Sequence, residues 1–353
     1  MDYPFIKVRK YYDALRTNTP FFKAPFLNKK KIIKNILIFL KDRKKIVIDN
    51  KPVTAQIEPT SCCNLKCDFC IREKIGVPIG TMNFNDFKII LDKLDCLFKI
   101  HLSGQGEPFL NKDIFKMIEY ANKRGILVNL NTNGTILNKE IIDRLCNVEV
   151  GEIAISIEST KPSEYEKLRR GAKFNDVMNN ITELIYALNN KKKKTIVSFA
   201  ITLLRDNINE IYSFINLAKK IGIKKLVVQT IQKKEDYIKN YKEKAKEQII
   251  SDTQEKINIK LREAKKIAEK NNVSFIFDEQ ESPGCIWPWR AIYVTWNGYI
   301  TPCCKILNYQ KPIIGNLLQD NLSKIWNGKY FQMFRRMLKQ RKAPYACKGC
   351  NMV

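Results

Sequence analysis

From residue 53 onward, short apolar runs alternate with amphipathic stretches of helical period. The apolar runs are rich in β-branched residues, as buried strands are, and lie at 53–57, 98–102, 126–130, 153–157, 196–203 and 225–229. Between them, apolar residues recur at helical spacing over 85–96, 113–123, 139–146, 175–188 and 207–221. Strands that alternate with helices favour a parallel sheet with right-handed crossovers. Six such repeats predict an α/β fold, a partial (β/α)6 parallel barrel.

The segments outside this repeat differ in pattern and composition. Residues 1–50 are basic and aromatic-rich, and 31–44 place apolar residues at helical spacing between lysines. Such a helix suits a membrane surface or a partner, but packing on the main domain fits better. Residues 233–272 are highly charged with helical periodicity, which indicates solvated helices. We predict a basic amphipathic leader at 1–50, the barrel at 51–232, a charged helical connection at 233–280 and a small cysteine-rich domain at 281–353.

The composition indicates a folded protein with an excess of positive charge. Hydrophobic residues make up 44% of 353 positions, yet no apolar run approaches the roughly 20 residues that span a bilayer. No signal-peptide pattern is visible, so we expect a cytoplasmic protein. The formal charge of +27 suits nucleic acid, a membrane surface or an acidic peptide.

The distribution of the basic residues weakens the first of these readings. Lysines lie on nearly every segment, and their densest runs lack the interleaved aromatics that stack on bases. We therefore interpret the charge as general lysine usage. Nucleic acid becomes a less favoured partner, and peripheral membrane contact stays open.

Cysteine is the residue type that carries most chemical information here. Most of the eleven cysteines stand in tight groups, which in a reducing cytoplasm favours metal binding over disulfides. Cys96 and Cys146 stand alone inside helical patterns and are predicted to be buried small hydrophobes. His101 is the only histidine, which excludes a multi-histidine zinc site. It lies at a predicted strand end, and we leave it out of the catalytic set.

Three cysteines follow the first predicted strand directly. Cys63, Cys67 and Cys70 form a C-x3-C-x2-C pattern. Three thiolates can hold a four-iron four-sulfur (4Fe-4S) cluster and leave one iron open for chemistry. A zinc site more often needs two C-x2-C pairs or histidines. Because active sites of parallel barrels lie beyond the strand C-termini, we expect the triplet at the barrel mouth, with the adjacent Cys62 as a bystander.

Further motifs follow the triplet in the order found in one enzyme family. They are Ser103-Gly104-Gln105-Gly106-Glu107-Pro108, Asn131-Thr132-Asn133-Gly134, Ser156-Ile157-Glu158 and Arg169. Over about residues 53–230 the chain thus resembles the radical S-adenosylmethionine (SAM) superfamily. The family's GGEP motif has Gln-Gly in place of Gly-Gly here, a small departure. The resemblance implies that the open iron binds SAM and that one electron cleaves SAM to a 5'-deoxyadenosyl radical.

The resemblance also implies a role for each matching residue. Phe69 would lie near the adenine, and Glu107 would offer negative charge to the methionine ammonium. Arg169 would bind the methionine carboxylate, which its planar fork suits. Cys63, Cys67 and Cys70 form the catalytic set. The cofactor-binding set, which includes glycines for close backbone approach and a ribose-contacting segment, is Phe69, Gly104, Gly106, Glu107, Asn133, Ser156, Glu158 and Arg169.

The C-terminal part resembles a SPASM-type extension, which carries auxiliary iron–sulfur clusters. Cys285 is followed after twelve residues by Gly298 and after four more by Cys303, as at the start of that element. The full version has seven cysteines and two clusters, so this chain matches a truncated, single-cluster (Twitch-type) form. The implied metal ligands are Cys285, Cys303, Cys347 and Cys350, with Cys304 as a substitute for Cys303. A structural zinc ion on the same thiols stays an alternative.

Together the resemblances imply a radical SAM oxidoreductase or maturase with SAM and two 4Fe-4S clusters, one of them auxiliary. An electron donor such as flavodoxin or ferredoxin is implied, and the substrate is a peptide, protein or small molecule. Relatives carry out peptide or protein maturation, alcohol or sugar dehydrogenation, and epimerisation, for which Cys304 or Cys62 would return a hydrogen atom. Two alternatives stay open: modification of tRNA or another nucleic acid, and a non-catalytic iron–sulfur electron carrier or scaffold.

Overall fold

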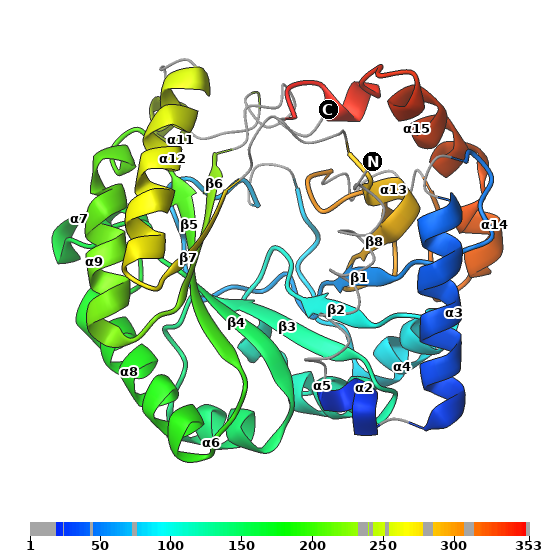
Figure 1. The fold of residues 1–353 in the computed structure, drawn as a ribbon, viewed down its shortest axis with the longest axis horizontal. Coiled ribbons are helices and arrows are strands. Elements are labelled where there is room, and N and C mark those ends of the chain that lie inside the picture. Colours follow the sequence, from blue (N-terminus) through cyan, green and yellow to red (C-terminus); the bar gives the residue numbers. More distant parts are fainter. Residues whose placement is uncertain are drawn as a thin grey trace.

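The computed structural model of the chain describes residues 19–23, 25–42, 45–72, 76–231, 239, 243–250, 254–277, 285–306 and 314–350. Within them, one nine-stranded sheet curls into an open barrel, and helices cover its outer side (Figure 1). The strand order is β7-β6-β5-β4-β3-β2-β1-β8-β9, and every neighbouring pair is parallel except β8 with β9. The predicted α/β parallel barrel is therefore confirmed.

Six strands correspond to the six apolar runs of the sequence. They are β1 (Thr54–Ile57), β2 (Lys99–Leu102), β3 (Leu127–Thr132), β4 (Val150–Ser156), β5 (Ile196–Leu203) and β6 (Lys225–Thr230). Three more strands extend this sheet: β7 (Ser274–Phe277) pairs with β6, β8 (Ala291–Val294) with β1, and β9 (Ile300–Thr301) with β8. The cysteine-rich part thus adds a strand directly beside the one that precedes the cysteine triplet.

The helices predicted between the strands are present, with small shifts at their ends. They are α4 (Phe84–Lys93), α5 (Ile114–Lys123), α6 (Lys139–Asn147), α8 (Phe174–Asn190) and α9 (Ile211–Ile221), the last preceded by the 3-10 turn η2 (Ile208–Glu210). α4 and α6 begin where the side chains of Asn83 and Asn138 accept hydrogen bonds from the first helical turn. The short α7 (Pro162–Leu168) is absent from the predicted set.

The charged connection contains α11 (Glu243–Glu247) and α12 (Gln254–Lys270), which agrees with its helical pattern. Residues 232–238, 240–242 and 251–253 lie outside the described residues. α12 packs on β7 and α9 through its buried residues Ile257, Leu261 and Ala264.

The N-terminal segment adds α2 (Thr19–Lys23) and α3 (Phe26–Asp42) to the outside of the barrel. Ile32, Ile36 and Phe39 of α3 are buried in the main hydrophobic core. Asn35 fixes this contact, because its amide donates to the carbonyl of Lys51 at 3.0 Å and accepts from the N–H of Lys51 at 2.8 Å. α3 therefore packs on the barrel through one face, as we expected for this segment.

The C-terminal part consists of α13 (Trp287–Arg290), α14 (Leu322–Trp326), α15 (Lys329–Lys339) and the 3-10 turn η3 (Tyr345–Cys347). Arg335 of α15 ties it to the rest of the chain. Its buried guanidinium group donates to the carbonyls of Pro288 and Ile46, at 2.9 and 3.1 Å. Trp326 lies 4.8 Å beneath that group and donates to the carbonyl of Asn50 at 2.7 Å. The barrel and the C-terminal part thus share one hydrophobic core.

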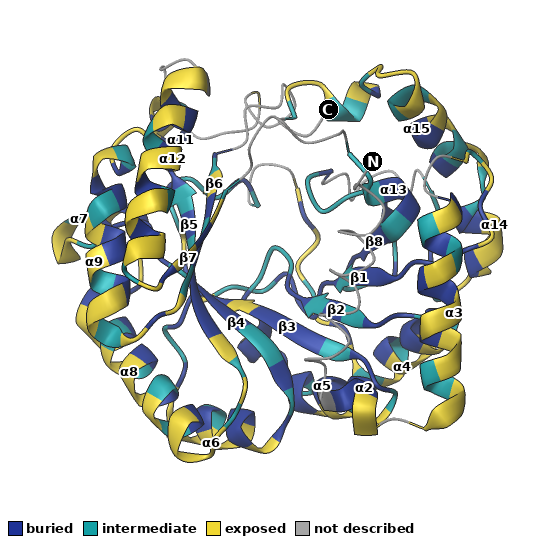
Figure 2. Cartoon of the chain, in the orientation of Figure 1, coloured by how far each residue is buried: buried dark blue, intermediate teal, exposed yellow. Residues whose placement is uncertain are grey.

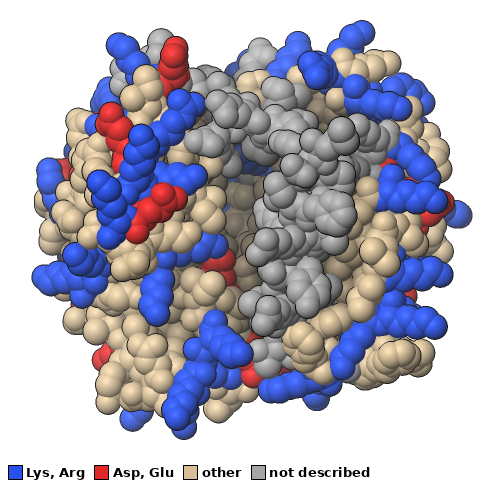
Figure 3. Space-filling view, in the orientation of Figure 1, with Lys and Arg blue, Asp and Glu red and all other residues tan. Residues whose placement is uncertain are grey.

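Burial follows this layered arrangement. The strands and inner helix faces are buried, whereas the outer helix faces are exposed (Figure 2). On the face shown in Figure 3, lysine and arginine side chains are spread over most of the surface, which agrees with general lysine usage. None of the described helices has the length and apolar character needed to cross a membrane.

Candidate functional site

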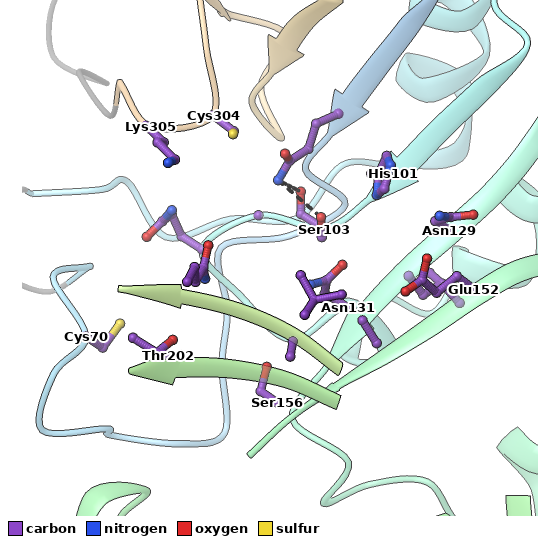
Figure 4. Close-up of a pocket in the computed structure, with 18 of the residues that line it drawn as sticks. Cys70, His101, Ser103, Asn129, Asn131, Glu152, Ser156, Thr202, Cys304 and Lys305 are labelled. Atoms are coloured by element: carbon purple, nitrogen blue, oxygen red, sulfur yellow. Dashed lines mark hydrogen bonds between the residues drawn. The ribbon is translucent and has the colours of Figure 1, made fainter. Parts of the chain in front are cut away.

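A cavity of about 640 Å³ opens at the centre of the barrel (Figure 4). Its wall comes from strands β1 to β7, from the loop after β1 and from the loop after β9. Parallel barrels usually fill this space with branched apolar side chains. Here the inward positions are mainly polar, and the pairing register places Gln56, His101, Asn129 and Glu152 side by side across β1 to β4. The interior can therefore hold a ligand by hydrogen bonds.

The three cysteines of the triplet lie half-buried in the loop after β1. The N–H groups of Lys66 and Asp68 donate to the carbonyls of Arg170 and Leu168, both at 3.0 Å, which fastens this loop to the end of α7. On the other side, the amide of Asn133 donates to Asn64 at 2.9 Å. The loop is thus held on one side by the end of α7 and on the other by the residue that follows β3.

Without a bound metal, the environment of the triplet favours the protonated thiol form of Cys63 and Cys67 over the thiolate. Burial raises the pKa of Cys67 to about 12, although the nearby Arg169 acts in the opposite direction. Burial also raises the pKa of Cys63. Thiols of this kind become thiolate ligands when bound iron supplies positive charge. A cluster on Cys63, Cys67 and Cys70 therefore fits the chemistry of these residues.

Among the residues that the structure describes, no three His, Cys, Asp or Glu side chains converge as ligands of one metal ion would. Ligands of a four-iron cluster each bind a different iron, so they do not need to meet at one point.

The loop after β2 packs tightly against the chain that leads into the triplet. A Cβ on Gly104 would overlap the side chain of Glu58, and a Cβ on Gly106 would overlap the carbonyl oxygen of Cys62. Glu58 also accepts a hydrogen bond from the N–H of Gln105 at 2.7 Å. Only glycine permits this approach, so both glycines are needed for the shape of the site.

Glu107 lies in this loop, but its side chain points away from the cavity. It caps the 3-10 turn η1 (Pro108–Leu110), and its carboxylate accepts hydrogen bonds from Thr132 Oγ1 and the N–H of Asn133, both at 2.8 Å. Burial raises its pKa to about 7, which these hydrogen bonds only partly oppose. Glu107 does not line the cavity, and its contact with a ligand ammonium stays a prediction. In the structure its carboxylate fixes the end of β3.

A buried ion pair lies beside the triplet. Arg169 Nε donates to Glu158 Oε2, and both side chains are at least nine-tenths buried. Burial alone would lower the pKa of Arg169, but the negative charge of Glu158 and the proximity of Cys67 raise it overall. The guanidinium also lies 5.8 Å from the ring centroid of Phe69. The guanidinium group of Arg169 is thus charged and held in a fixed orientation at the cavity wall.

The residues assigned to SAM by resemblance fall into two groups. Phe69, Gly104, Ser156 and Arg169 line the cavity, together with Cys70 of the triplet. Gly106, Glu107, Asn133 and Glu158 do not line it. Of these four, Glu158 holds the cavity-lining Arg169, while the other three contact the loops around the triplet and the end of β3.

Several cavity residues were missed by the sequence reasoning. Glu152 of β4 pairs with Lys225 of β6 at 2.7 Å and accepts a hydrogen bond from Ser198 of β5 at 2.7 Å. His101 lies on the same part of the wall (Figure 4), and burial lowers its pKa to about 3, so it is neutral. These residues could have been predicted from the sequence, because polar residues recur at every second position of otherwise apolar strands. Alternate residues point to the same face of a strand, so this pattern indicates a polar face toward the barrel interior.

The four cysteines predicted as C-terminal ligands line a second, small cavity. Cys285, Cys303, Cys347 and Cys350 share it with the apolar side chains of Trp287, Pro288, Phe334 and Leu338. Burial, together with the nearby Cys303 and Cys350, raises the pKa of Cys285 to about 11. The four thiols are therefore gathered from three separate segments into one apolar chamber, which suits a bound cluster or ion.

Cys303 and its neighbour Cys304 line different cavities, although their two thiols also interact with each other. Cys303 lines the small apolar cavity, whereas Cys304 lines the central cavity. Figure 4 shows Cys304 and Lys305 on the loop after β9, while Cys70 comes from the loop after β1. Cys62 lines neither cavity, and its Sγ lies 3.9 Å from the carbonyl oxygen of Gly80. The wall between the two chambers thus consists in part of adjacent cysteines.

Comparison with known proteins yields two matching family models. A model described as the radical SAM superfamily matches residues 57–218, and a model described as an iron-sulfur cluster-binding domain, SPASM, matches residues 285–351. The first range contains the cysteine triplet. The second contains all four cysteines of the small cavity.

Individual relatives agree with these models. The chain is 23% identical to the tungsten-containing aldehyde ferredoxin oxidoreductase cofactor-modifying protein of Pyrococcus furiosus, over 84% of this chain and 86% of that protein. It is 30% identical to the AdoMet-dependent heme synthase of Methanosarcina barkeri, but over only 50% of each protein, so it spans about half of that relative.

A solved structure shows the same fold. SuiB of Streptococcus suis, bound to its precursor peptide SuiA, superposes with a TM-score of 0.65 at 15% identity, over 85% of this chain and 70% of SuiB. This likeness concerns the fold, and the two matched family models cover the barrel and the C-terminal part of the chain. The chain contains a radical SAM domain over residues 57–218 and a SPASM-type iron–sulfur domain over residues 285–351.

Proposed function

We propose that this chain is a radical SAM maturase that abstracts a hydrogen atom from a peptide held in the central cavity. The observation that carries the proposal is the placement of two cysteine sites around one polar cavity. Cys70 and Cys304 both line that cavity, while Cys303 beside Cys304 belongs to the second site. A substrate radical formed beside the first cysteine site would therefore lie near the second site, which could accept the leftover electron.

The first site would hold SAM by groups already in position. Cys63, Cys67 and Cys70 would hold a 4Fe-4S cluster, and Arg169, oriented by Glu158, would bind the methionine carboxylate. Ser156 would contact the ribose, and Phe69 the adenine. Since the carboxylate of Glu107 is occupied, a contact from the glycine loop to the methionine ammonium would come from backbone carbonyls. When bound, the clusters would supply one-electron chemistry: reductive cleavage of SAM at the first and removal of the leftover electron at the second.

A peptide substrate is supported by the chemistry of the cavity wall. Gln56, Asn131, Thr202 and Gln229 offer amides and hydroxyls, which pair with peptide N–H and carbonyl groups. SuiB, which shares this fold, was solved with a precursor peptide, and the Pyrococcus relative is named for modifying a cofactor. An alcohol or sugar substrate would use the same hydrogen-bonding groups and is the second candidate.

Cys304 separates two outcomes of the reaction. If it only supports the wall, the substrate radical loses an electron and a proton, and the net change is a two-electron oxidation. If its thiol returns a hydrogen atom to the radical carbon, the net change is epimerisation, and the sulfur must then be reduced again by the electron donor. Cys62 does not line the cavity, so Cys304 is the better placed hydrogen donor of the two.

Anaerobic reconstitution followed by SAM and dithionite tests the enzymatic proposal. We expect 5'-deoxyadenosine from the wild type and about eight irons per chain, falling to about four in the Cys63→Ala, Cys67→Ala, Cys70→Ala triple variant. Absence of 5'-deoxyadenosine would favour a non-catalytic electron carrier or scaffold. Zinc in place of the residual iron would rule out an electron-accepting second site. Tight, salt-steep binding of tRNA would favour the nucleic-acid alternative.

A further inference from the structure

The outer face of α3 carries an exposed apolar stripe. Phe26, Ile33 and Leu37 are 75%, 43% and 59% exposed, and their spacing of seven and four residues places them on one side of the helix. Phe22 of α2, at 56% exposed, comes just before this helix. Single exposed apolar residues are ordinary, but a stripe on a helix face is a different feature. The opposite face of α3 is already buried in the barrel core.

The same outer face has only positive charge. At 100° per residue, Lys29 falls on one side of the stripe, and Lys30, Lys34 and Lys41 fall on the other. None of these four lysines forms an ion pair within the described part of the chain. The only acidic residue of α3, Asp42, is buried and pairs with Lys45 at 2.6 Å.

α12 shows that lysine-rich usage alone does not produce this arrangement. It also exposes two large apolar residues, Ile259 at 48% and Ile267 at 40%. However, the exposed glutamates Glu255, Glu263 and Glu269 are interleaved with its basic residues. Mixed charge of this kind is typical of a solvated helix. α3 differs because it combines an apolar stripe with an unbalanced positive border.

We propose that α3 docks the folded protein on the surface of an anionic phospholipid bilayer. Phe26, Ile33 and Leu37 would enter the headgroup region, while the flanking lysines bind lipid phosphates and keep their charge in water. Helices that lie in the membrane interface have this combination of an apolar face and a basic border. Because the inner face of α3 stays packed on the barrel, the whole molecule is brought to the surface without unfolding.

Charge complementarity selects this partner over a second copy of the chain. A symmetric contact through α3 would bring the lysines of two copies together without acidic partners on that face. An anionic bilayer supplies many phosphates and an apolar layer beneath them. The docking is independent of SAM chemistry, because no residue of the outer face lines either cavity.

Vesicle sedimentation of the full-length, cluster-reconstituted protein tests the docking. We expect binding to vesicles of one part phosphatidylglycerol to two parts phosphatidylcholine. On pure phosphatidylcholine, binding should be on the order of 100-fold weaker, and added salt should weaken it further on the anionic vesicles. Equal binding to both lipids, or no binding to the anionic vesicles, would overturn the proposal.

Two matched sets of substitutions make the test specific. The triple variant Phe26→Ser, Ile33→Ser, Leu37→Ser should bind anionic vesicles at least about tenfold more weakly. The control Ile259→Ser, Ile267→Ser on α12 should bind like the wild type. Thermal unfolding should show that both variants fold, since all five side chains are exposed. Loss of a wild-type dimer in the triple variant, with vesicle binding unchanged, would assign this face to a second copy instead.

Discussion

Burial and neighbouring charged groups together determine the charge state of individual side chains around the central cavity. Arg169 stays charged because Glu158 offsets the cost of burying it, whereas His101 loses its proton because burial dominates and its neighbours Lys99, Arg290 and Lys225 are cationic. The wall facing a substrate therefore presents a neutral imidazole, and its Glu152–Lys225 pair has no net charge.

The neutral state of His101 predicts an acid-sensitive stability. The unfolded imidazole has a pKa near 6.5, and the folded value is about 3. Between these values the unfolded chain binds a proton that the folded chain does not, so stability is lost as the pH falls below about 6.5. At about pH 5.5 the loss is about 1.4 kcal/mol.

The His101→Gln variant should therefore lose less thermal stability than the wild type between about pH 7.5 and 5.5. His101 is the only histidine, so this substitution removes every imidazole from the chain. Thr202→Val, at a cavity position that does not titrate, should keep the wild-type response. An equal drop in melting temperature for His101→Gln and the wild type would contradict the low pKa.

At this scale, the sequence identified the residues that carry chemistry better than the directions in which they point. The triplet and the four C-terminal cysteines were readable from their spacing. The outward turn of Glu107 was not, because it depends on Thr132 and Asn133 of the next strand, whose proximity only the fold creates.

At the scale of elements, the site is a contact between loops that follow adjacent parallel strands. The glycine loop after β2 rests on the backbone that leads from β1 to Cys63, and the N–H of Glu107 donates to the carbonyl of Cys62 at 2.8 Å. The position of Cys63, the first of the three predicted cluster ligands, is therefore set partly by the neighbouring loop.

Gly106→Ala should disturb this contact directly. The added Cβ would overlap the carbonyl oxygen of Cys62, which belongs to the backbone and cannot rotate away. We expect reconstituted iron to fall from about eight to about four per chain, because the triplet loop is displaced while the C-terminal site is untouched. Gly222→Ala at the end of α9 strains a backbone φ of 84° and should lower stability, but its nearest side chain lies 3.9 Å away and the site is remote from the triplet, so this variant should keep its iron. Unchanged iron in Gly106→Ala would show that the loop yields without losing its ligand geometry.

Elements with strong local periodicity were predictable, and elements defined by distant pairing were not. The six strands and their helices follow from alternating patterns over 53–230. β8 was missed because its four residues pair with β1, which lies more than 200 positions earlier in the chain. No local pattern shows which edge of a sheet a late strand will join.

At the scale of the whole molecule, β8 and β9 bring Cys303 and Cys304 to the barrel mouth. Because β8 continues the barrel sheet, the loop after β9 reaches the central cavity with Cys304 and Lys305, while Cys303 turns into the small cavity. One short loop thus contributes to both chambers. The radical SAM and SPASM domains meet at this loop, and buried residues of both belong to one hydrophobic core.

Because Cys303 and Cys304 line different cavities, we predict that alanine substitutions of the two have different effects on reconstituted iron. Cys303→Ala removes a thiol from the small cavity, so reconstituted iron should fall from about eight to about four per chain while 5'-deoxyadenosine is still formed. Cys304→Ala removes a thiol that faces the central cavity, so iron should stay near about eight. The reverse pattern, with iron lost only from Cys304→Ala, would mean that Cys304 replaces Cys303 as the ligand. If Cys304→Ala keeps its iron but converts an epimerised product into an oxidised one, the cavity-facing thiol is the hydrogen donor, and the two chambers divide the end of the reaction between them.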